Sequence, residues 1–282
     1  MIIFKHTEDL QRYLDSPDRQ KQLRGFAPTM GALHDGHISL IAASRSKCAI
    51  TLCSIFVNPT QFNDPKDLEK YPRMVDADIR LLESVSCDYA FVPAVQEVYP
   101  VGSQLLDLSF GRLEQVMEGA FRPGHFKGMA TVVKRLFDIV QPTRAYFGEK
   151  DFQQLAIVRL MVRQLELPIE VKGCPTLRES DGLAMSSRNM LLTDAQRKAA
   201  PLIYKGMNMG REYIPTMSPA AIKDLVIRYI EQSPLLRVQY FEIVHPDTLE
   251  PVNDWEGIDE ARACIAVLTD GPRLIDNMAY PI

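Results

Sequence analysis

The sequence has no long apolar run, no basic tail and no excess of positive charge. Its longest apolar stretch, residues 49–57, is far too short to span a bilayer. The net charge is -4, and Lys and Arg do not cluster, which argues against nucleic acid as a partner. Residues 1–9 include Glu8 and Asp9, where a secretion signal would have apolar residues. We therefore expect neither a membrane nor a nucleic-acid partner.

The cysteines are few, scattered and odd in number, and no Cys-x-x-Cys occurs. Such a set is typical of free thiols in a reducing compartment, and it excludes a disulfide framework and a cysteine zinc site. The sequence therefore predicts a cytoplasmic protein. The five residues are Cys48, Cys53, Cys87, Cys174 and Cys264.

The composition, 46% hydrophobic and 24% charged over 282 residues, is that of a globular protein with a sizeable core. Strand-like apolar runs alternate with helix-like periodic segments in the first two thirds. This alternation predicts a doubly wound, Rossmann-like parallel sheet with helices on both faces. The predicted strands are 23–27, 49–57, 89–92, 145–147 and 169–171, and the predicted helices are 37–43, 74–84, 128–140 and 152–165.

The pattern changes after residue 178. Two helical segments, 193–209 and 218–232, begin at Thr193 and Ser218, which are good N-caps. Strand-like segments follow at 238–244 and 261–268. We predict a Rossmann-like domain over 1–178 and a smaller α+β domain over 179–282.

Residues 28–37 read Pro-Thr-Met-Gly-Ala-Leu-His-Asp-Gly-His and follow a predicted strand. A glycine-bearing turn before a helix N-terminus suits phosphate, because its N–H groups lack partners and the helix dipole adds positive charge. His34 and His37 offer two more donors at the same end. The alternative is a loop with two exposed histidines.

Neither common nucleotide fingerprint is present. Gly31 and Gly36 have the spacing of a P-loop, but His37 and Ile38 stand where Lys and Ser or Thr would follow. No Gly-x-Gly-x-x-Gly occurs. The phosphate prediction therefore depends on the two histidines.

Three further segments follow predicted strands or join the domains. Asn58 and Gln61 offer neutral donors and acceptors for hydroxyl groups and a carboxylate, although turn residues of this kind can be purely structural. Lys150 could bind a triphosphate, with Gln154 one helical turn beyond it; the alternative is an acidic helix start with a solvated lysine.

The third segment, residues 184–189, includes Ser186, Ser187 and Arg188, whose hydroxyl and guanidinium groups can bind outer phosphates. The alternative is that this segment is only a serine-rich linker between the domains. A glycine-rich, basic stretch at 118–128 could form a mobile lid, but we favour a long surface loop.

Together these segments resemble the pantothenate synthetase (pantoate–β-alanine ligase) family, within the adenylyl-transfer superfamily that has a His-x-Gly-His motif. The similarity runs in family order over residues 26–195. The motifs are Pro28-Thr29-Met30-Gly31, His34-Asp35-Gly36-His37, residues 56–62, Tyr71-Pro72-Arg73, residues 122–126, residues 148–151 and Met185-Ser186-Ser187-Arg188. One departure is Thr60, where methionine or leucine is common.

The resemblance implies that ATP and pantoate give pantoyl adenylate, which β-alanine converts to pantothenate and AMP. It also implies Mg²⁺, a homodimer, and a C-terminal domain that covers the active site. We assign no metal-ligating residue, because the sequence does not identify protein ligands for Mg²⁺; Asp151 is one candidate, and phosphates and water could suffice. The implied catalytic residues are His37, the family's proton donor, with His34, Lys150 and Arg188. The implied ATP-binding residues are Met30, Gly31, Ala32, Leu33, His34, Asp35, Gly36, His37, Gly148, Glu149, Lys150, Asp151, Leu177, Met185, Ser186, Ser187 and Arg188. Gln61, Gln154 and Asn58 would bind substrate.

Other functions are weighed against this one. An enzyme that joins a phosphate ester to AMP should have extra basic residues for the acceptor, whereas Asn58, Gln61 and Gln154 are neutral. An aminoacyl-tRNA synthetase would need an RNA-binding domain, and the acidic C-terminal third does not suggest one. A protein that binds ATP without turnover would not need every polar group that is present here.

Overall fold

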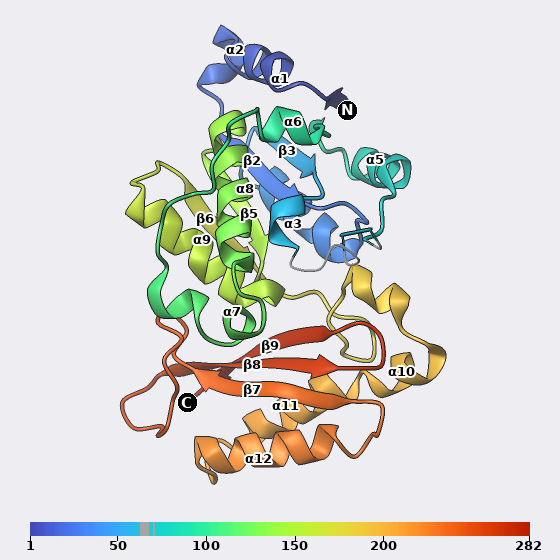
Figure 1. The fold of residues 1–282 in the computed structure, drawn as a ribbon, viewed down its shortest axis with the longest axis vertical. Helices are drawn as coiled ribbons and strands as arrows, with labels where there is room; N and C mark the ends of the chain where they lie inside the picture. Colours follow the sequence, from blue (N-terminus) through green and yellow to red (C-terminus); the bar gives the residue numbers. More distant parts are fainter. Residues whose placement is uncertain (63–67, 70) are drawn as a thin grey trace. The chain divides into compact units, whose positions relative to one another are not determined.

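A six-stranded parallel sheet organises the first two thirds of the chain in the computed structural model, which describes residues 1–62, 68–69 and 71–282. The strand order is β1-β4-β3-β2-β5-β6, and all its strand pairs are parallel (Figure 1). All of β3 is buried, as expected for a central parallel strand. The strands are β1 (Ile2–Phe4), β2 (Arg24–Thr29), β3 (Ile50–Ile55), β4 (Tyr89–Phe91), β5 (Arg144–Gly148) and β6 (Glu170–Cys174).

Helices cover both faces of this sheet. Neighbouring residues of a strand point to opposite faces. Phe26 of β2 contacts the ring of Phe137 on α8, while the next residue, Ala27, belongs to a buried cluster with Leu40 and Ile41 of α3. The doubly wound prediction is therefore confirmed. The helices of this part are α1 (Thr7–Leu14), α2 (Pro17–Gln20), α3 (Asp35–Arg45), α5 (Val75–Ser84), α6 (Val95–Val98), α7 (Glu118–Phe121), α8 (His125–Val140) and α9 (Phe152–Gln164), with 3-10 turns η1 (Pro59–Gln61), η2 (Gly111–Glu114) and η3 (Glu149–Asp151).

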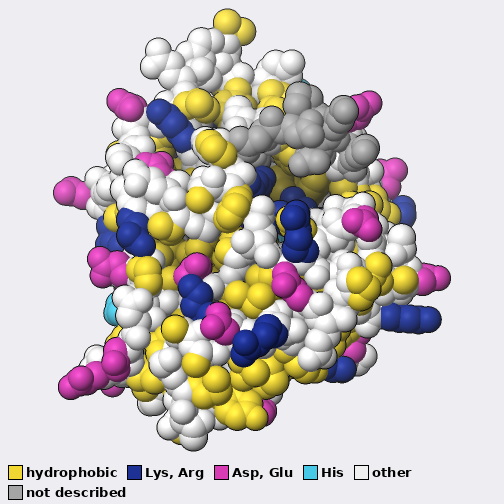
Figure 2. Space-filling model, turned by 60° about the horizontal axis from the view of Figure 1, so that its bottom comes forward, with side chains coloured by type: hydrophobic (Ala, Val, Ile, Leu, Met, Phe, Trp, Pro, Cys, Tyr) yellow, Lys and Arg dark blue, Asp and Glu magenta, His cyan; other side chains and the backbone are white. Residues whose placement is uncertain are grey.

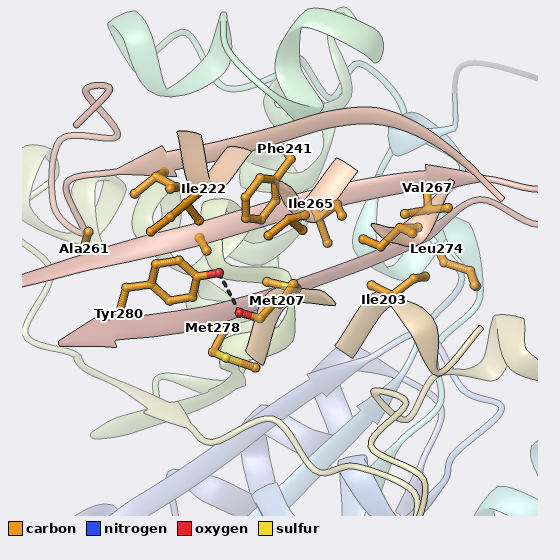
Figure 3. Close-up of a cluster of buried hydrophobic side chains, with 14 of the residues drawn as sticks. Ile203, Met207, Ile222, Phe241, Ala261, Ile265, Val267, Leu274, Met278 and Tyr280 are labelled. Carbon is orange, nitrogen blue, oxygen red and sulfur yellow. Dashed lines mark hydrogen bonds between the residues drawn. The ribbon is translucent and has the colours of Figure 1, made fainter. Parts of the chain in front are cut away.

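The rest of the chain forms a three-stranded antiparallel sheet, β7-β8-β9, with helices packed on one face. Alternate residues of β8, such as Ile265 and Val267, face Ile203 and Met207 of α11 and Ile222 of α12 (Figure 3). The elements are η4 (Ser187–Leu191), α10 (Asp194–Ala199), α11 (Leu202–Glu212), α12 (Pro219–Ile230), β7 (Arg237–Val244), β8 (Glu260–Leu268) and β9 (Leu274–Pro281).

Two compact units result, and each is described by itself. Unit 1 comprises residues 1–148 and 153–175, and unit 2 comprises residues 149–152 and 176–282. The short segment 149–152 thus lies with the C-terminal sheet, although the predicted division was 1–178 and 179–282. The division into domains over 1–178 and 179–282 stays a prediction.

The parallel sheet changes direction between β2 and β5. These strands are neighbours, yet the chain proceeds from β2 to β3 on one side and from β5 to β6 on the other. Ligands of doubly wound sheets bind outside the carboxyl ends of strands at such a switch point. Residues 30–37 follow β2 directly and residues 149–151 follow β5, so both sequence-predicted phosphate segments begin there.

Two local predictions need correction, and one strand of the C-terminal sheet was missed. The helix predicted over 193–209 is divided into α10 and α11, because Pro201 lacks the N–H that a continuous helix needs. The stretch 118–128 is not a long surface loop: it contains α7 and the start of α8, and both Glu118 and His125 are buried. Strand β9 was not predicted, because Asp276 and Asn277 interrupt its apolar pattern.

The surface carries charges of both signs, as the near-balanced composition suggests. Basic and acidic side chains are interspersed on the face that Figure 2 presents. Among the described residues, no helix is both long and apolar enough to cross a membrane. The five cysteines are not joined by disulfide bonds, as predicted.

The core of unit 2 contains one buried tyrosine whose hydroxyl group can be tested directly. The Tyr280 hydroxyl donates to the main-chain oxygen of Met207 at 2.7 Å, and the ring has no exposed surface (Figure 3). We expect Tyr280→Phe to lower the free energy of unfolding by about 1 kcal/mol. Urea unfolding measures this change, with the exposed Tyr213→Phe as control. Equal unfolding midpoints for the two variants would contradict the prediction.

Candidate functional site

Residues 30–34 form the turn between β2 and α3, and two of them have left-handed backbone conformations. Gly31 has φ 80° and Ala32 has φ 48°. A Cβ at residue 31 would lie 2.9 Å from Asp78 Oδ2, so glycine is favoured there. The N–H groups of Ala32 and Leu33 donate to Asp78, at 3.0 Å to Oδ2 and 2.7 Å to Oδ1. A buried carboxylate therefore stabilises this turn.

Several main-chain donors of the segment are already bonded, which corrects the expectation of open N–H groups. The N–H of His34 donates to His37 Nδ1 at 3.3 Å, and the N–H of Gly36 donates to His34 Nδ1 at 3.1 Å. The two preceding residues bind Asp78. Side chains close to the turn bind these donors, because buried N–H groups are costly to leave unpaired. An anion here would be bound chiefly by side chains and the dipole of α3.

The two imidazoles have a defined tautomer. Each Nδ1 accepts from a main-chain N–H, so it carries no proton, and each neutral ring must carry its proton on Nε2. The ring centroids are 4.1 Å apart, and both side chains are half-buried at the start of α3. His34 and His37 therefore offer a pair of Nε2–H donors.

A second turn, residues 58–62, follows β3 and places neutral amides beside Met30. Asn58 Nδ2 donates to Gln61 Oε1 at 3.1 Å, and Gln61 Nε2 lies 2.8 Å from the Met30 sulfur. Asn58 Oδ1 accepts from the Tyr99 hydroxyl at 2.9 Å. Sulfur is a weak acceptor, so the Nε2 group of Gln61 could donate to a stronger acceptor instead. The buried Asn58 amide orients Gln61 through its hydrogen bond to Oε1.

Helix α8 stabilises this second turn. His125 Nδ1 donates to the Gln61 main-chain oxygen at 2.9 Å, and His125 Nε2 accepts from Arg122 Nη1 at 3.1 Å. A carbonyl can only accept and a guanidinium can only donate, so this ring is neutral with its proton on Nδ1. A Cβ at Gly128 would lie 2.2 Å from the Thr60 oxygen, so the turn packs directly on the helix backbone.

In unit 2, the C-terminal sheet binds the segment 149–151. Asn277 Nδ2 donates to the main-chain oxygens of Glu149 and Lys150, both at 2.8 Å. Arg262 Nη2 donates to Glu149 Oε2 at 2.9 Å and its guanidinium lies over the Phe152 ring, 4.3 Å from the centroid. The strand register places Arg262 and Asn277 on the same face of the sheet. These bonds fix the backbone from which the Lys150 side chain extends.

Residues 177–189 form a small hairpin and the turn η4. The N–H of Met185 donates to the Leu177 oxygen at 3.0 Å, which places two predicted nucleotide-lining residues side by side. Ser186 is the N-cap of η4, and its hydroxyl accepts from the N–H of Arg188 at 3.3 Å. No ion pair or hydrogen bond joins the Lys150 or Arg188 side chain to any residue within the described ranges.

The structure brings many of the predicted residues together within each unit. In unit 1, Met30 lies beside Gln61, and the two histidines lie beside each other; Gln154 lies half-buried near the start of α9. In unit 2, Asp151 is exposed at the end of η3. The sequence reasoning missed the residues that support these segments: Asp78, His125, Arg262 and Asn277. No local motif marks them, because each acts on a distant part of the chain.

Comparisons with known proteins agree along the whole chain. A family model described as pantoate-beta-alanine ligase matches residues 2–279. A pantothenate synthetase of Bacteroides thetaiotaomicron is 49% identical over 280 residues, 99% of each chain. The solved structure of pantothenate synthetase from Thermus thermophilus is 43% identical with a TM-score of 0.93, covering 99% of each chain. A pantoate-beta-alanine ligase from Francisella tularensis, solved in complex with beta-gamma ATP and beta-alanine, is 34% identical with a TM-score of 0.83, covering 99% of this chain and 97% of that one.

The close approach of Gly128 to the second turn gives a stability prediction. Gly128→Ala must displace the Thr60 carbonyl, so we expect a loss of about 1–3 kcal/mol in the free energy of unfolding. Thermal and urea unfolding measure the loss. Gly271→Ala is the matched control, because its added Cβ would meet only ordinary contacts, the nearest at 3.8 Å. Equal stability of the two variants would show that the turn and α8 separate easily.

Proposed function

Because the chain belongs to the pantoate–β-alanine ligase family, we propose that it condenses pantoate with β-alanine at the expense of ATP, through a pantoyl-adenylate intermediate. The products are pantothenate, AMP and pyrophosphate. The paired Nε2–H donors of His34 and His37, at the start of α3 and at the switch point of the sheet, are the observation that carries this proposal.

In the first step, a carboxylate oxygen of pantoate attacks the α-phosphorus of ATP, and the bond to the bridging oxygen breaks. Pyrophosphate leaves with the electron pair. Pantoate is already ionised at neutral pH, so no general base is needed. The residues have to position the two reactants and stabilise the charge on the phosphates. His34 and His37 would donate to the phosphates, and Lys150 and Arg188 would supply positive charge.

The serines and apolar residues would complete the ATP site. Ser186 and Ser187 would donate to phosphate oxygens, while Leu177 and Met185 would line the nucleotide pocket. The bond between Met185 and Leu177 supports this assignment, because it keeps the two side chains adjacent.

Pantoate would bind to Gln61 and Gln154, beside Met30. Neutral amides suit a carboxylate nucleophile, since an arginine would bind its charge tightly and weaken its attack. Asn58 would act through Gln61, because its own amide is buried and bonded. The sulfur contact of Gln61 Nε2 would be exchanged for a hydrogen bond to substrate.

In the second step, the amine of β-alanine attacks the acyl carbon of pantoyl adenylate. The bond from this carbon to the AMP oxygen breaks, AMP leaves with the electron pair, and the amine nitrogen loses a proton. Gln61 would also lie near β-alanine. Assembly as a homodimer, a cytoplasmic location and a C-terminal domain that covers the site are further expectations from family membership.

Mg²⁺ would enter with ATP. Within residues 1–62, 68–69 and 71–282, no group of three or more His, Cys, Asp or Glu side chains could hold a metal ion, but exposed Asp151 offers one carboxylate. A single carboxylate fits Mg²⁺, which commonly keeps several waters and binds substrate phosphates. The ion would neutralise phosphate charge. The side chains named above would position pantoate and ATP.

The test of the proposed function is product release from purified protein with ATP, Mg²⁺ and pantoate, with and without β-alanine. We expect pyrophosphate with pantoate alone and steady AMP formation only after β-alanine is added. AMP formation without pantoate, or no pyrophosphate under any condition, would overturn the proposal.

The histidine pair gives a catalytic prediction. We expect His34→Ala or His37→Ala to lower kcat about 100- to 1,000-fold, the usual effect of removing one donor to developing charge. Steady-state assays measure this loss. His245→Ala is the control, because His245 Nδ1 also accepts a main-chain N–H, from Asp247 at 3.2 Å. A loss below about threefold at His34 or His37 would remove that residue from the mechanism.

The side-chain amide of Gln61 gives a prediction about substrate binding. We expect Gln61→Ala to raise the KM for pantoate about tenfold or more, and to raise the KM for ATP much less, because Gln61 would contact pantoate and not the nucleotide. Initial rates over both substrate concentrations separate the two constants. Gln164→Ala, an exposed glutamine on α9, should change neither. Equal increases for both substrates would indicate that Gln61 is structural.

A further inference from the structure

Asp78 is a buried carboxylate with no place in the chemistry proposed above. It lies in the first turn of α5, and 2% of its surface is exposed. Burial raises its pKa, and the N–H groups of Leu33 and Ala32 act in the opposite direction by bonding its charged form. An acidic side chain is rarely buried unless its partners compensate it. Its partners here are main-chain donors of the turn before α3.

The geometry shows what the carboxylate does for that turn. Its two oxygens accept from consecutive N–H groups, at 3.0 Å from Ala32 and 2.7 Å from Leu33. Ala32 has a left-handed backbone, with φ 48°, which is costly for a residue with a Cβ. The two hydrogen bonds offset this cost and fix the conformation that leads directly into His34.

We propose that Asp78 is a positioning residue for ATP: its carboxylate fixes the left-handed turn at Ala32 and Leu33, and thereby the direction in which His34 and His37 present their Nε2–H donors. This inference rests on the proposed function, since it assumes that the histidines bind ATP. Asp78 itself does not contact substrate. Its effect is to keep the donors in place before ATP arrives, so that binding does not have to order the turn.

The substitution Asp78→Asn tests this role with little change in size. An asparagine can accept from only one of the two N–H groups, and its own NH₂ would face the other. We expect the KM for ATP to rise about tenfold, while the KM for pantoate changes less than about threefold. Initial rates of pyrophosphate release at varied ATP and pantoate measure both constants.

The matched control is Asp76→Asn. Asp76 lies in the same first turn of α5 but is exposed, so both variants lose the same charge at the same helix end. A merely structural defect would lower the fraction of active enzyme and hence kcat, without a selective change in the KM for ATP. An ATP KM for Asp78→Asn within about twofold of that for Asp76→Asn would overturn the inference.

Amide hydrogen exchange separates this inference from the proposed function. In the wild-type protein we expect the Ala32 and Leu33 amides to exchange at least about 100-fold more slowly than in an unstructured peptide. Exchange at the unprotected rate would overturn the role of Asp78, even if Asp78→Asn fails to fold. Absence of pyrophosphate from the wild type overturns the proposed function instead, whereas an active wild type with no selective effect of Asp78→Asn overturns only this inference.

Discussion

The backbone groups of a loop at the end of a parallel strand must find partners outside the sheet, and this requirement explains most of the candidate site. A strand that ends leaves N–H and C=O groups without a ladder, and leaving such groups unpaired and buried is costly. Asp78 accepts from the turn after β2, His125 donates to the turn after β3, and Asn277 donates to the segment after β5. Each loop thus depends on one polar side chain from a distant element.

This arrangement divides the polar residues into two groups. Asn58, Asp78 and Asn277 are almost fully buried and bonded within the protein, so they determine where the loops lie. The side chains of Lys150 and Gln154 are only half-buried, which suits contact with small molecules. Preorganised donors stabilise developing charge well because they need no rearrangement during the reaction. Lys150 and Gln154 are therefore distinct from the residues that only support loops, whereas His34 and His37 also bond their own turn through Nδ1.

The sequence predicted the parts of this site that are local. A nearly continuous apolar run marks β3, and the glycine and histidine spacing at 28–37 marks the start of α3. Asp78, in contrast, acts on a turn 45 residues away, and Asn277 acts on Lys150, 127 residues away. Such pairs leave no periodic pattern in a single sequence. The same residues disrupt local signals: Asn277 interrupts the apolar alternation of β9, because it faces the segment that it binds.

The basic residues of unit 2 differ in whether an acidic side chain pairs with them. Arg178 pairs with Asp276, Arg197 with Glu179 and Asp181, and Arg262 with Glu149, so these guanidinium groups are neutralised within the protein. In contrast, Lys150 and Arg188 have no acidic partner in the part of the chain that the structure describes. An unpaired cation next to polar hydroxyl groups favours an anion of several charges. Because Arg178, Arg197 and Arg262 are already paired, a triphosphate bound by Lys150 and Arg188 would not compete with these ion pairs.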